Sequence, residues 1–327
     1  MVDLDELSGP DAPPFPLLPW DEGAPPDAAW ALARYEAVRA RLPVATFPAA
    51  AVSAPGLLAI AHAFDTFVLD AFGVLNVGED PVPSALETIT ELANAGKTLI
   101  VLSNGATRDA DAAFTKYRAL GFNFEPEQIC SSRNALELAL QAYPDGMRWG
   151  FAAPIYANIQ TFGVPCCHLG DDAAAYDQVD GFVYLGQRDW TPDRQTLLEA
   201  AIRKRPRPVL CGNPDLVAPV GSGFSIEPGA FAHALADRCG IEVTFLGKPF
   251  GNAFDLALER ATAHLGGKVD KGRTAMVGDT LHTDIIGGAA AGLRTVLVTD
   301  HGLFRGLDAR PYMASSGIVP DYVVPTT

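Results

Sequence analysis

Short apolar runs alternate with stretches of helical pattern along the chain, and this alternation most constrains its fold. Runs of strand-forming residues occur at 67–69, 99–102 and 274–277, and a helical segment follows each of them. A strand–helix–strand–helix order is typical of a parallel sheet with right-handed crossovers, in which strands are buried on both faces. We therefore predict an α/β fold in three layers, with helices on both sides of a parallel sheet.

A second α/β pattern interrupts the first one. From about residue 144, short strand-like pieces alternate with helical segments, and the first pattern resumes near residue 242. We predict a core domain made of residues 61–143 and 242–327, and an inserted α/β domain over residues 144–241. Residues 1–60 form an N-terminal extension, in which the Pro- and Ala-rich residues 1–28 favour an irregular segment and residues 28–41 favour a helix.

The composition excludes several classes of partner. The formal net charge is -15 and the isoelectric point about 4.7, so we expect no nucleic-acid ligand and no anionic membrane surface. The sequence has no signal-peptide pattern and no uninterrupted apolar run of the ~18 residues that a membrane span needs. The five cysteines include no CxxC pair, which suits reduced thiols. A cytoplasmic protein is the expectation.

Polar residues stand where four of the apolar runs end. They are Asp70, Ser103 with Asn104, Lys248, and Asp279 followed by Asp284. Because the carboxyl ends of parallel strands lie at one edge of a sheet, and ligands bind at that edge, we expect these side chains to converge. Taken singly, each is equally typical of a helix cap or a turn, but their joint occurrence in this order favours chemistry.

These residue types are the ones that phosphoryl transfer needs. A carboxylate such as Asp70 can attack phosphorus and form an aspartyl-phosphate. A hydroxyl, an amide and an ammonium can hold the phosphoryl oxygens, and clustered carboxylates suit Mg²⁺, which prefers hard oxygen ligands. The sequence thus predicts a Mg²⁺-dependent phosphatase or phosphotransferase that acts on a small phosphorylated metabolite.

The same stretches resemble the motifs of the haloacid dehalogenase superfamily of phosphohydrolases. The matching motifs are LDAFGVL around Asp70, VLSNG with Ser103, GKP with Lys248, and VGDTLHTD with Asp279 and Asp284. The insertion resembles the large cap of subfamily IIA, which includes pyridoxal, phosphoglycolate and sugar or nucleotide phosphatases, and GNPD at 212–215 matches that cap. The resemblance covers about residues 61–305 and implies a Rossmann-like core with an inserted cap domain.

The resemblance also implies roles for individual residues, with Mg²⁺ as the cofactor. The implied catalytic residues are Asp70 as nucleophile, Ser103, Asn104 and Lys248. The implied metal ligands are Asp70, the backbone carbonyl of Phe72 and Asp279, with Asp284 assisting. The implied substrate-binding residues are Gly105, Asn213 and Asp215. The substrate itself is not identified, and a homodimer is left open.

Phe72 departs from the pattern of the superfamily's phosphatases. They carry a second aspartate at this position, which protonates the leaving oxygen, and general acid–base help of this kind is worth ~10²–10⁴-fold. His282 is an alternative donor, although a solvent-facing histidine is the expectation there.

Two other functions remain open because of Phe72. One is a haloacid dehalogenase, since DAFG and LSNG also resemble motifs of those enzymes; the acids of VGDTLHTD argue against it because they suit a cation. The other is a phosphometabolite-binding protein with weakened catalysis.

Overall fold

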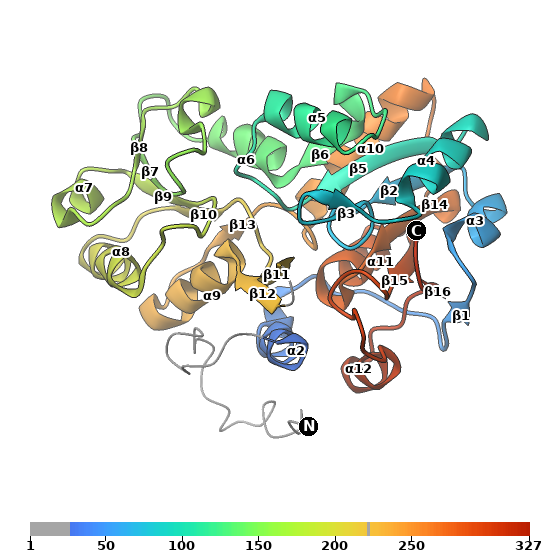
Figure 1. Ribbon diagram of the computed structural model, residues 1–327. Helices are drawn as coiled ribbons and strands as arrows, with labels where there is room; N and C mark the ends of the chain where they lie inside the picture. Colours follow the sequence, from blue (N-terminus) through green and yellow to red (C-terminus); the bar gives the residue numbers. More distant parts are fainter. Residues whose placement is uncertain (1–26, 221–222) are drawn as a thin grey trace.

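Two parallel sheets organise the protein, as seen in a computed structural model that describes residues 27–220 and 223–327 (Figure 1). The larger sheet has seven strands in the order β1-β16-β15-β14-β2-β5-β6, and the smaller has five in the order β13-β10-β9-β7-β8. Every pairing within these two sheets is parallel. Two short antiparallel hairpins, β3–β4 and β11–β12, complete the strands. The predicted α/β fold is confirmed.

The strands of the larger sheet are β1 (Val52–Ser53), β2 (Thr66–Leu69), β5 (Thr98–Ser103), β6 (Ile129–Ser131), β14 (Thr274–Gly278), β15 (Arg294–Val298) and β16 (Tyr322–Val324). Those of the smaller sheet are β7 (Trp149–Ala152), β8 (Cys166–His168), β9 (Gly181–Tyr184), β10 (Val209–Cys211) and β13 (Thr244–Phe245). The hairpins are β3 (Asn76–Val77) with β4 (Asp80–Pro81), and β11 (Val217–Val220) with β12 (Gly223–Ile226).

The helices are α2 (Ala28–Ala37), α3 (Leu57–Ile60), α4 (Ala85–Asn94), α5 (Ala110–Ala119), α6 (Ser132–Leu140), α7 (Ala173–Asp177), α8 (Pro192–Lys204), α9 (Pro228–Cys239), α10 (Gly251–Leu265), α11 (Ile286–Ala290) and α12 (Arg310–Ser316). A π-helical turn, Leu281–Ile285, leads directly into α11.

Strand β2 lies inside the larger sheet, between β14 and β5. Phe67 and Leu69 point to one face and pack with apolar residues of α3 and α4, whereas Val68 points to the other face and packs against α10. This alternation gives three layers. It also explains why the sequence of a strand covered on both faces is apolar throughout.

One expected strand belongs to a different sheet. The run before Lys248 was expected in the first sheet, but β13 pairs with β10 at the edge of the smaller one. An apolar run predicts a strand but not the strand with which it pairs, so the sequence could not show to which sheet β13 belongs. The smaller sheet therefore includes residues beyond position 241, where we placed the end of the insertion. The division into core and inserted domains stays a prediction.

The remaining expectations concern the two ends of the chain. Helix α2 ends at Ala37, and a 3₁₀ turn, Arg39–Arg41, covers the rest of the predicted helix. The irregular segment predicted for residues 1–28 lies almost wholly outside the described residues. Residues after 307 contain α12 and the short strand β16. In the part of the chain that the structure describes, no helix is long and apolar enough to cross a membrane.

Candidate active site

Asp70 follows β2 directly, at the carboxyl edge of the larger sheet. Its backbone N–H donates to the carbonyl of Val277 at 2.9 Å, which continues the pairing of β2 with β14 by one residue. The chain then turns away at Gly73, which has a φ of +75°. This is the left-handed region that favours glycine. The turn leaves the Asp70 carboxylate at the strand end, where the sequence predicted it.

Gly73 also belongs to a close backbone contact around Asp279. A Cβ atom on Gly73 would lie 2.7 Å from Cα of Gly302, and one on Gly302 would lie 1.9 Å from Oδ2 of Asp279. The Oδ2 atom also accepts the N–H of Leu303 at 2.7 Å, and Oδ1 accepts the hydroxyl of Thr280 at 2.9 Å. The main chain on both sides therefore fixes the Asp279 carboxylate.

Lys248 lies among the three carboxylates of this edge. Its ammonium donates to Oδ1 of Asp70 and lies 2.8 Å from Oδ1 of Asp284. The side chains of Lys248 and Asp284 are only 3% and 1% exposed, so water screens this pair poorly. The four predicted polar strand ends thus converge, although Lys248 arrives from the end of the smaller sheet.

The charges of the cluster do not balance, and the pKa values reflect this. Burial, with a contribution from the charge of Asp284, raises the pKa of Asp70 to about 6 although Lys248 opposes the shift. Burial and the charges of Asp70 and Asp284 raise the pKa of Asp279 well above its usual range. Burial alone would lower the pKa of Lys248, but the charges of Asp284 and Asp70 outweigh it and raise that pKa.

Three carboxylates beside one ammonium carry an excess of negative charge, which a bound cation could neutralise. Asp70, Asp279 and Asp284 each offer an oxygen atom, and these atoms lie within 4.8 Å of one another. The Oδ1 atom of Asp284 is buried without a hydrogen bond of good geometry, and its contact is the ion pair with Lys248. Hard oxygen donors in this number suit Mg²⁺ or Ca²⁺ rather than a metal that prefers nitrogen or sulfur.

Asn104 connects the two halves of the site. Its side-chain oxygen accepts the backbone N–H of Lys248 at 2.7 Å, and its amide donates to Oδ1 of Asp215 at 2.8 Å. It is 3% exposed, so its role here is to hold these two residues together. Ser103 is half-buried, and its hydroxyl accepts the N–H of Gly105 at 3.1 Å.

A cavity of about 230 Å³ opens beside this cluster. Nearly all predicted site residues line it: Asp70, Phe72, Ser103, Asn104, Gly105, Asn213, Asp215, Lys248 and Asp279. Asp284 does not line it but lies buried behind, where Oδ2 accepts the N–H of Thr280 at 3.0 Å. The cavity is lined by loops of the larger sheet, by loops that follow strands of the smaller sheet and by hairpin β11–β12, and its volume suits a small ligand.

Two carboxyl groups on either side of hairpin β11–β12 line the cavity, Asp215 in the loop after β10 and Glu227 directly after β12. Burial raises the pKa of Asp215 to about 8 against the opposing effect of Lys248. Burial also raises the pKa of Glu227 to about 7. Glu227 accepts hydrogen bonds from Gln187 at 3.0 Å and from Asn213 at 3.1 Å. Both acids bind protons more readily than exposed carboxyl groups do.

Several cavity residues were absent from the sequence predictions, including Thr107, Arg108, Tyr156, Gln187 and Glu227. Glu227 directly precedes the sequence PGAF at 228–231, which also resembles the cap of subfamily IIA and could have drawn attention to Glu227. Gln187 and Tyr156 lie in loops without a recognisable pattern.

His282 is wrongly predicted as a solvent-facing residue. Its side chain is fully buried, and its Nε2 atom lies 2.5 Å from Oε1 of Glu36. Burial lowers the pKa of His282. It is not among the residues that line the cavity, so it has no access to a ligand there. The sequence could not reveal this because Glu36 is 246 positions away.

Phe72 lines the cavity, as predicted, but its ring also has a charged neighbour. The ammonium of Lys116 lies 5.0 Å from the ring centroid and donates to Oδ1 of Asn76 at 3.2 Å. Burial and the neighbouring charge of Arg108 lower the pKa of Lys116 to about 8. A carboxylate in place of Phe72 would therefore meet a cation.

Comparison with known proteins identifies the family of this chain. The model of the haloacid dehalogenase-like hydrolases matches residues 67–154, and a related model of similar hydrolases matches residues 245–326. Glycerol-3-phosphate phosphatase of Gallus gallus is 30% identical over 80% of this chain and 88% of its own length. Chronophin of Homo sapiens is 30% identical over 79% and 88%.

The fold agrees as well. A solved structure of a haloacid dehalogenase superfamily protein from Cytophaga hutchinsonii superimposes with a TM-score of 0.73, at 24% identity, over 82% of this chain and 95% of that one. This chain belongs to the haloacid dehalogenase-like hydrolases, which confirms the expected family.

Proposed function

We propose that the protein is a Mg²⁺-dependent phosphatase that acts on a small phosphorylated metabolite through an aspartyl-phosphate on Asp70. The observation that carries the proposal is the buried cluster of Asp70, Asp279, Asp284 and Lys248 beside a small cavity. The relatives named glycerol-3-phosphate phosphatase and chronophin support the same class of reaction. All five cysteines are free, and this supports a cytoplasmic location, where thiols stay reduced.

In the first step a carboxylate oxygen of Asp70 attacks phosphorus, and the bond between phosphorus and the leaving oxygen breaks. In the second step water attacks phosphorus, the Asp70–phosphate bond breaks, and inorganic phosphate leaves. Lys248 and Ser103 both line the cavity, and we assign to the ammonium and the hydroxyl the role of holding the phosphoryl oxygens as charge develops on them. Mg²⁺ held by Asp70, Asp279 and the Phe72 carbonyl would neutralise phosphoryl charge, while Asp284 orients Lys248.

The leaving oxygen needs a proton that Phe72 cannot supply. Asp215 is the acid that we assign to this step, because it lines the cavity and its raised pKa keeps it protonated near neutral pH. In the first step its proton goes to the leaving oxygen. In the second step the resulting carboxylate accepts a proton from the attacking water, which returns Asp215 to its starting state.

The site chemistry favours phosphoryl transfer over the two alternatives. Displacement of a halide requires a carboxylate substrate beside Asp70, which the unbalanced charge of Asp279 and Asp284 would repel. A binding protein with decayed catalysis would not need Asp70 and Lys248 in contact. Turnover of phosphate esters by the purified protein separates these three functions.

Mg²⁺ is expected to raise the melting temperature and to be required for turnover. Binding to the folded state alone stabilises it by mass action, by about 2.7 kcal/mol at a ligand concentration of 100 Kd. The measurement is a thermal melt with and without millimolar Mg²⁺, repeated on Asp279→Asn. The variant should lose most of the shift. A wild-type melt indifferent to Mg²⁺, with turnover resistant to EDTA, would contradict the metal assignment.

Asp215→Asn is expected to make the rate depend steeply on the leaving group. Without a proton donor, alkyl phosphates should slow by ~10²-fold or more, the low end of the range for general acid catalysis, while aryl phosphates change little. The measurement is a series of phosphate monoesters of graded leaving-group pKa.

Phe72→Asp in the Asp215→Asn background tests whether a second acid can protonate the leaving oxygen, because it places a carboxyl group where relatives carry one. Partial recovery of alkyl phosphate turnover is expected, limited by the charge of Lys116 beside the ring. His282→Ala should leave the leaving-group dependence unchanged. Equal slowing of alkyl and aryl substrates by Asp215→Asn would remove Asp215 as the donor.

A further inference from the structure

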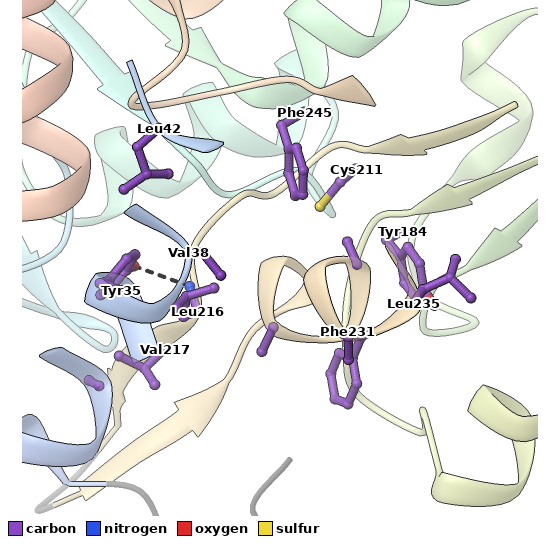
Figure 2. Close-up of a cluster of buried hydrophobic side chains, with 14 of the residues drawn as sticks. Tyr35, Val38, Leu42, Tyr184, Cys211, Leu216, Val217, Phe231, Leu235 and Phe245 are labelled. Carbon is purple, nitrogen blue, oxygen red and sulfur yellow. Dashed lines mark hydrogen bonds between the residues drawn. The ribbon is translucent and has the colours of Figure 1, made fainter. Parts of the chain in front are cut away.

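Helix α2 packs into a buried cluster that includes residues of both sheets and of the helices around them. Figure 2 shows Tyr35 and Val38 of this N-terminal segment facing Leu216 and Val217, with Phe231 and Leu235 of α9 nearby. The same cluster includes Ile285 and Ile286, which follow the acids of the larger sheet. The family models begin at residue 67, so this helix lies outside the part of the chain that they match.

Tyr35 contacts the two halves of the site at once. Its hydroxyl accepts the backbone N–H of Leu216 at 3.1 Å, and Leu216 directly follows Asp215 (Figure 2). Its ring stacks on the ring of His282, with centroids 5.0 Å apart and planes 9° apart. His282 lies between Asp279 and Asp284 in the sequence. One side chain, 2% exposed, therefore joins the loop of residues 213–216 to the turn that holds the acids.

The electrostatics agree with this placement. Burial raises the pKa of Tyr35 well above its usual range, and the charge of Asp215 is the next cause, followed by a hydrogen bond that opposes the shift and then by Asp279 and Asp284. Because its pKa is raised from an already high ordinary value, the hydroxyl is neutral near pH 7. A neutral hydroxyl can accept the Leu216 N–H without adding charge to an acidic site.

Neighbouring contacts hold the helix in place on both sides. Glu36 bonds to His282 on the side of the larger sheet. Arg41, in the 3₁₀ turn after α2, forms an ion pair with Asp237 and lies 3.5 Å from His233, both on α9. Because these contacts lie on either side of Tyr35, its hydroxyl has a fixed position relative to the 213–216 loop.

We propose that Tyr35 is a positioning residue, which holds the 213–216 loop so that Asn213 and Asp215 face the reaction centre. Only the expected effect of Tyr35 on kcat/KM rests on the proposed function; its role in holding the loop does not. Without the hydroxyl, the Leu216 N–H would be buried without its partner, and the loop would leave its place for part of the time. Asp215 would then be absent from the cavity in that fraction of molecules, which lowers the competent population.

The first test needs no catalytic activity. Tyr35→Phe removes the hydroxyl and keeps the ring that stacks on His282. Amide hydrogen exchange of a peptide covering residues 213–217 should accelerate by about 3- to 10-fold, as expected for the loss of one neutral hydrogen bond. Tyr176→Phe is the matched control, since Tyr176 is equally buried and its hydroxyl donates to the Gly170 carbonyl at 2.8 Å, outside the cavity. Unchanged exchange at 213–217 in Tyr35→Phe would overturn the proposal.

The second test is a double-mutant cycle on kcat/KM with an alkyl phosphate and Mg²⁺, because the alkyl leaving group depends on the proton of Asp215. Tyr35→Phe should lower kcat/KM by about 3- to 10-fold in the wild type and should have no further effect in an Asp215→Ala background. Tyr176→Phe should leave both values unchanged. Equal losses in the two backgrounds, or faster exchange with unchanged kcat/KM, would show that Tyr35 serves stability alone. If the wild type hydrolyses no phosphate ester, the proposed function fails and the exchange experiment still decides the role of Tyr35.

Discussion

Asp70→Asn is expected to abolish turnover of phosphate esters and to leave the fold intact. An amide is not a nucleophile toward phosphorus, and loss of a covalent nucleophile costs about 10⁴- to 10⁶-fold in kcat. The fold should persist because the change removes a buried carboxylate whose pKa is already raised, and Lys248 keeps its ion pair with Asp284. The measurement is kcat on an aryl phosphate, with intact-protein mass after acid quench to detect a phosphorylated wild-type enzyme.

Asp65→Asn is the matched control for this experiment. Asp65 precedes β2 as Asp70 follows it, but its carboxylate pairs with Arg273 near the protein surface, at the opposite end of the strand. Turnover of Asp65→Asn should equal that of the wild type. If Asp70→Asn kept near wild-type rates, or if the wild type never carried a phosphoryl group during turnover of any ester, the covalent route would be wrong.

Lys248→Met is expected to reduce both activity and stability. Removal of one preorganised donor to a transition state costs about 10²–10³-fold in kcat. Without the ammonium, Asp70 and Asp284 are left in a buried site, and breaking a buried ion pair in this way costs about 3–5 kcal/mol of the free energy of unfolding. The stability loss should be largest without metal, since a divalent cation would replace part of the missing charge. The measurement is urea unfolding of wild type and variant in EDTA and in Mg²⁺.

Lys97→Met is the control for this loss in the free energy of unfolding, because it removes a lysine from a more exposed ion pair. Lys97 lies 3.8 Å from an Asp65 carboxylate that is 58% exposed, and a pair of this kind contributes about 1 kcal/mol or less. A similar stability loss in the two variants would mean that the cluster around Lys248 is screened like a surface pair, against the burial described above.

The sequence was informative wherever a local pattern determines structure. The run Phe67–Leu69 predicted a strand buried on both faces, and β2 is such a strand in the interior of the sheet. The position of Asp70 at its end followed from the same pattern, because the edge of a parallel sheet is defined by strand direction. Residues 213–215 were found through a motif, and Asn213 and Asp215 line the cavity.

Contacts between distant segments were beyond such patterns. Periodicity indicated a helix near residues 28–41, yet nothing in it shows that Tyr35 and Glu36 reach His282. Residues 1–60 were predicted only as an N-terminal extension for this reason. Helix α2 nevertheless packs into a cluster that includes residues of both sheets. The partner of β13 was equally hidden, because strand propensity carries no information about register across the chain.

The contact between Gly73, Gly302 and Asp279 bears on how this protein could acquire a new substrate. Main-chain atoms enclose the acid so closely that a single added methyl group at Gly302 would lie 1.9 Å from its oxygen. Single mutations of Gly73 or Gly302 would displace Asp279 and abolish turnover before they changed substrate selectivity. The wall of the cavity at Tyr156 and Val220 consists of exposed side chains that can be exchanged one at a time. Directed evolution for altered specificity should therefore randomise that wall and leave the glycines fixed.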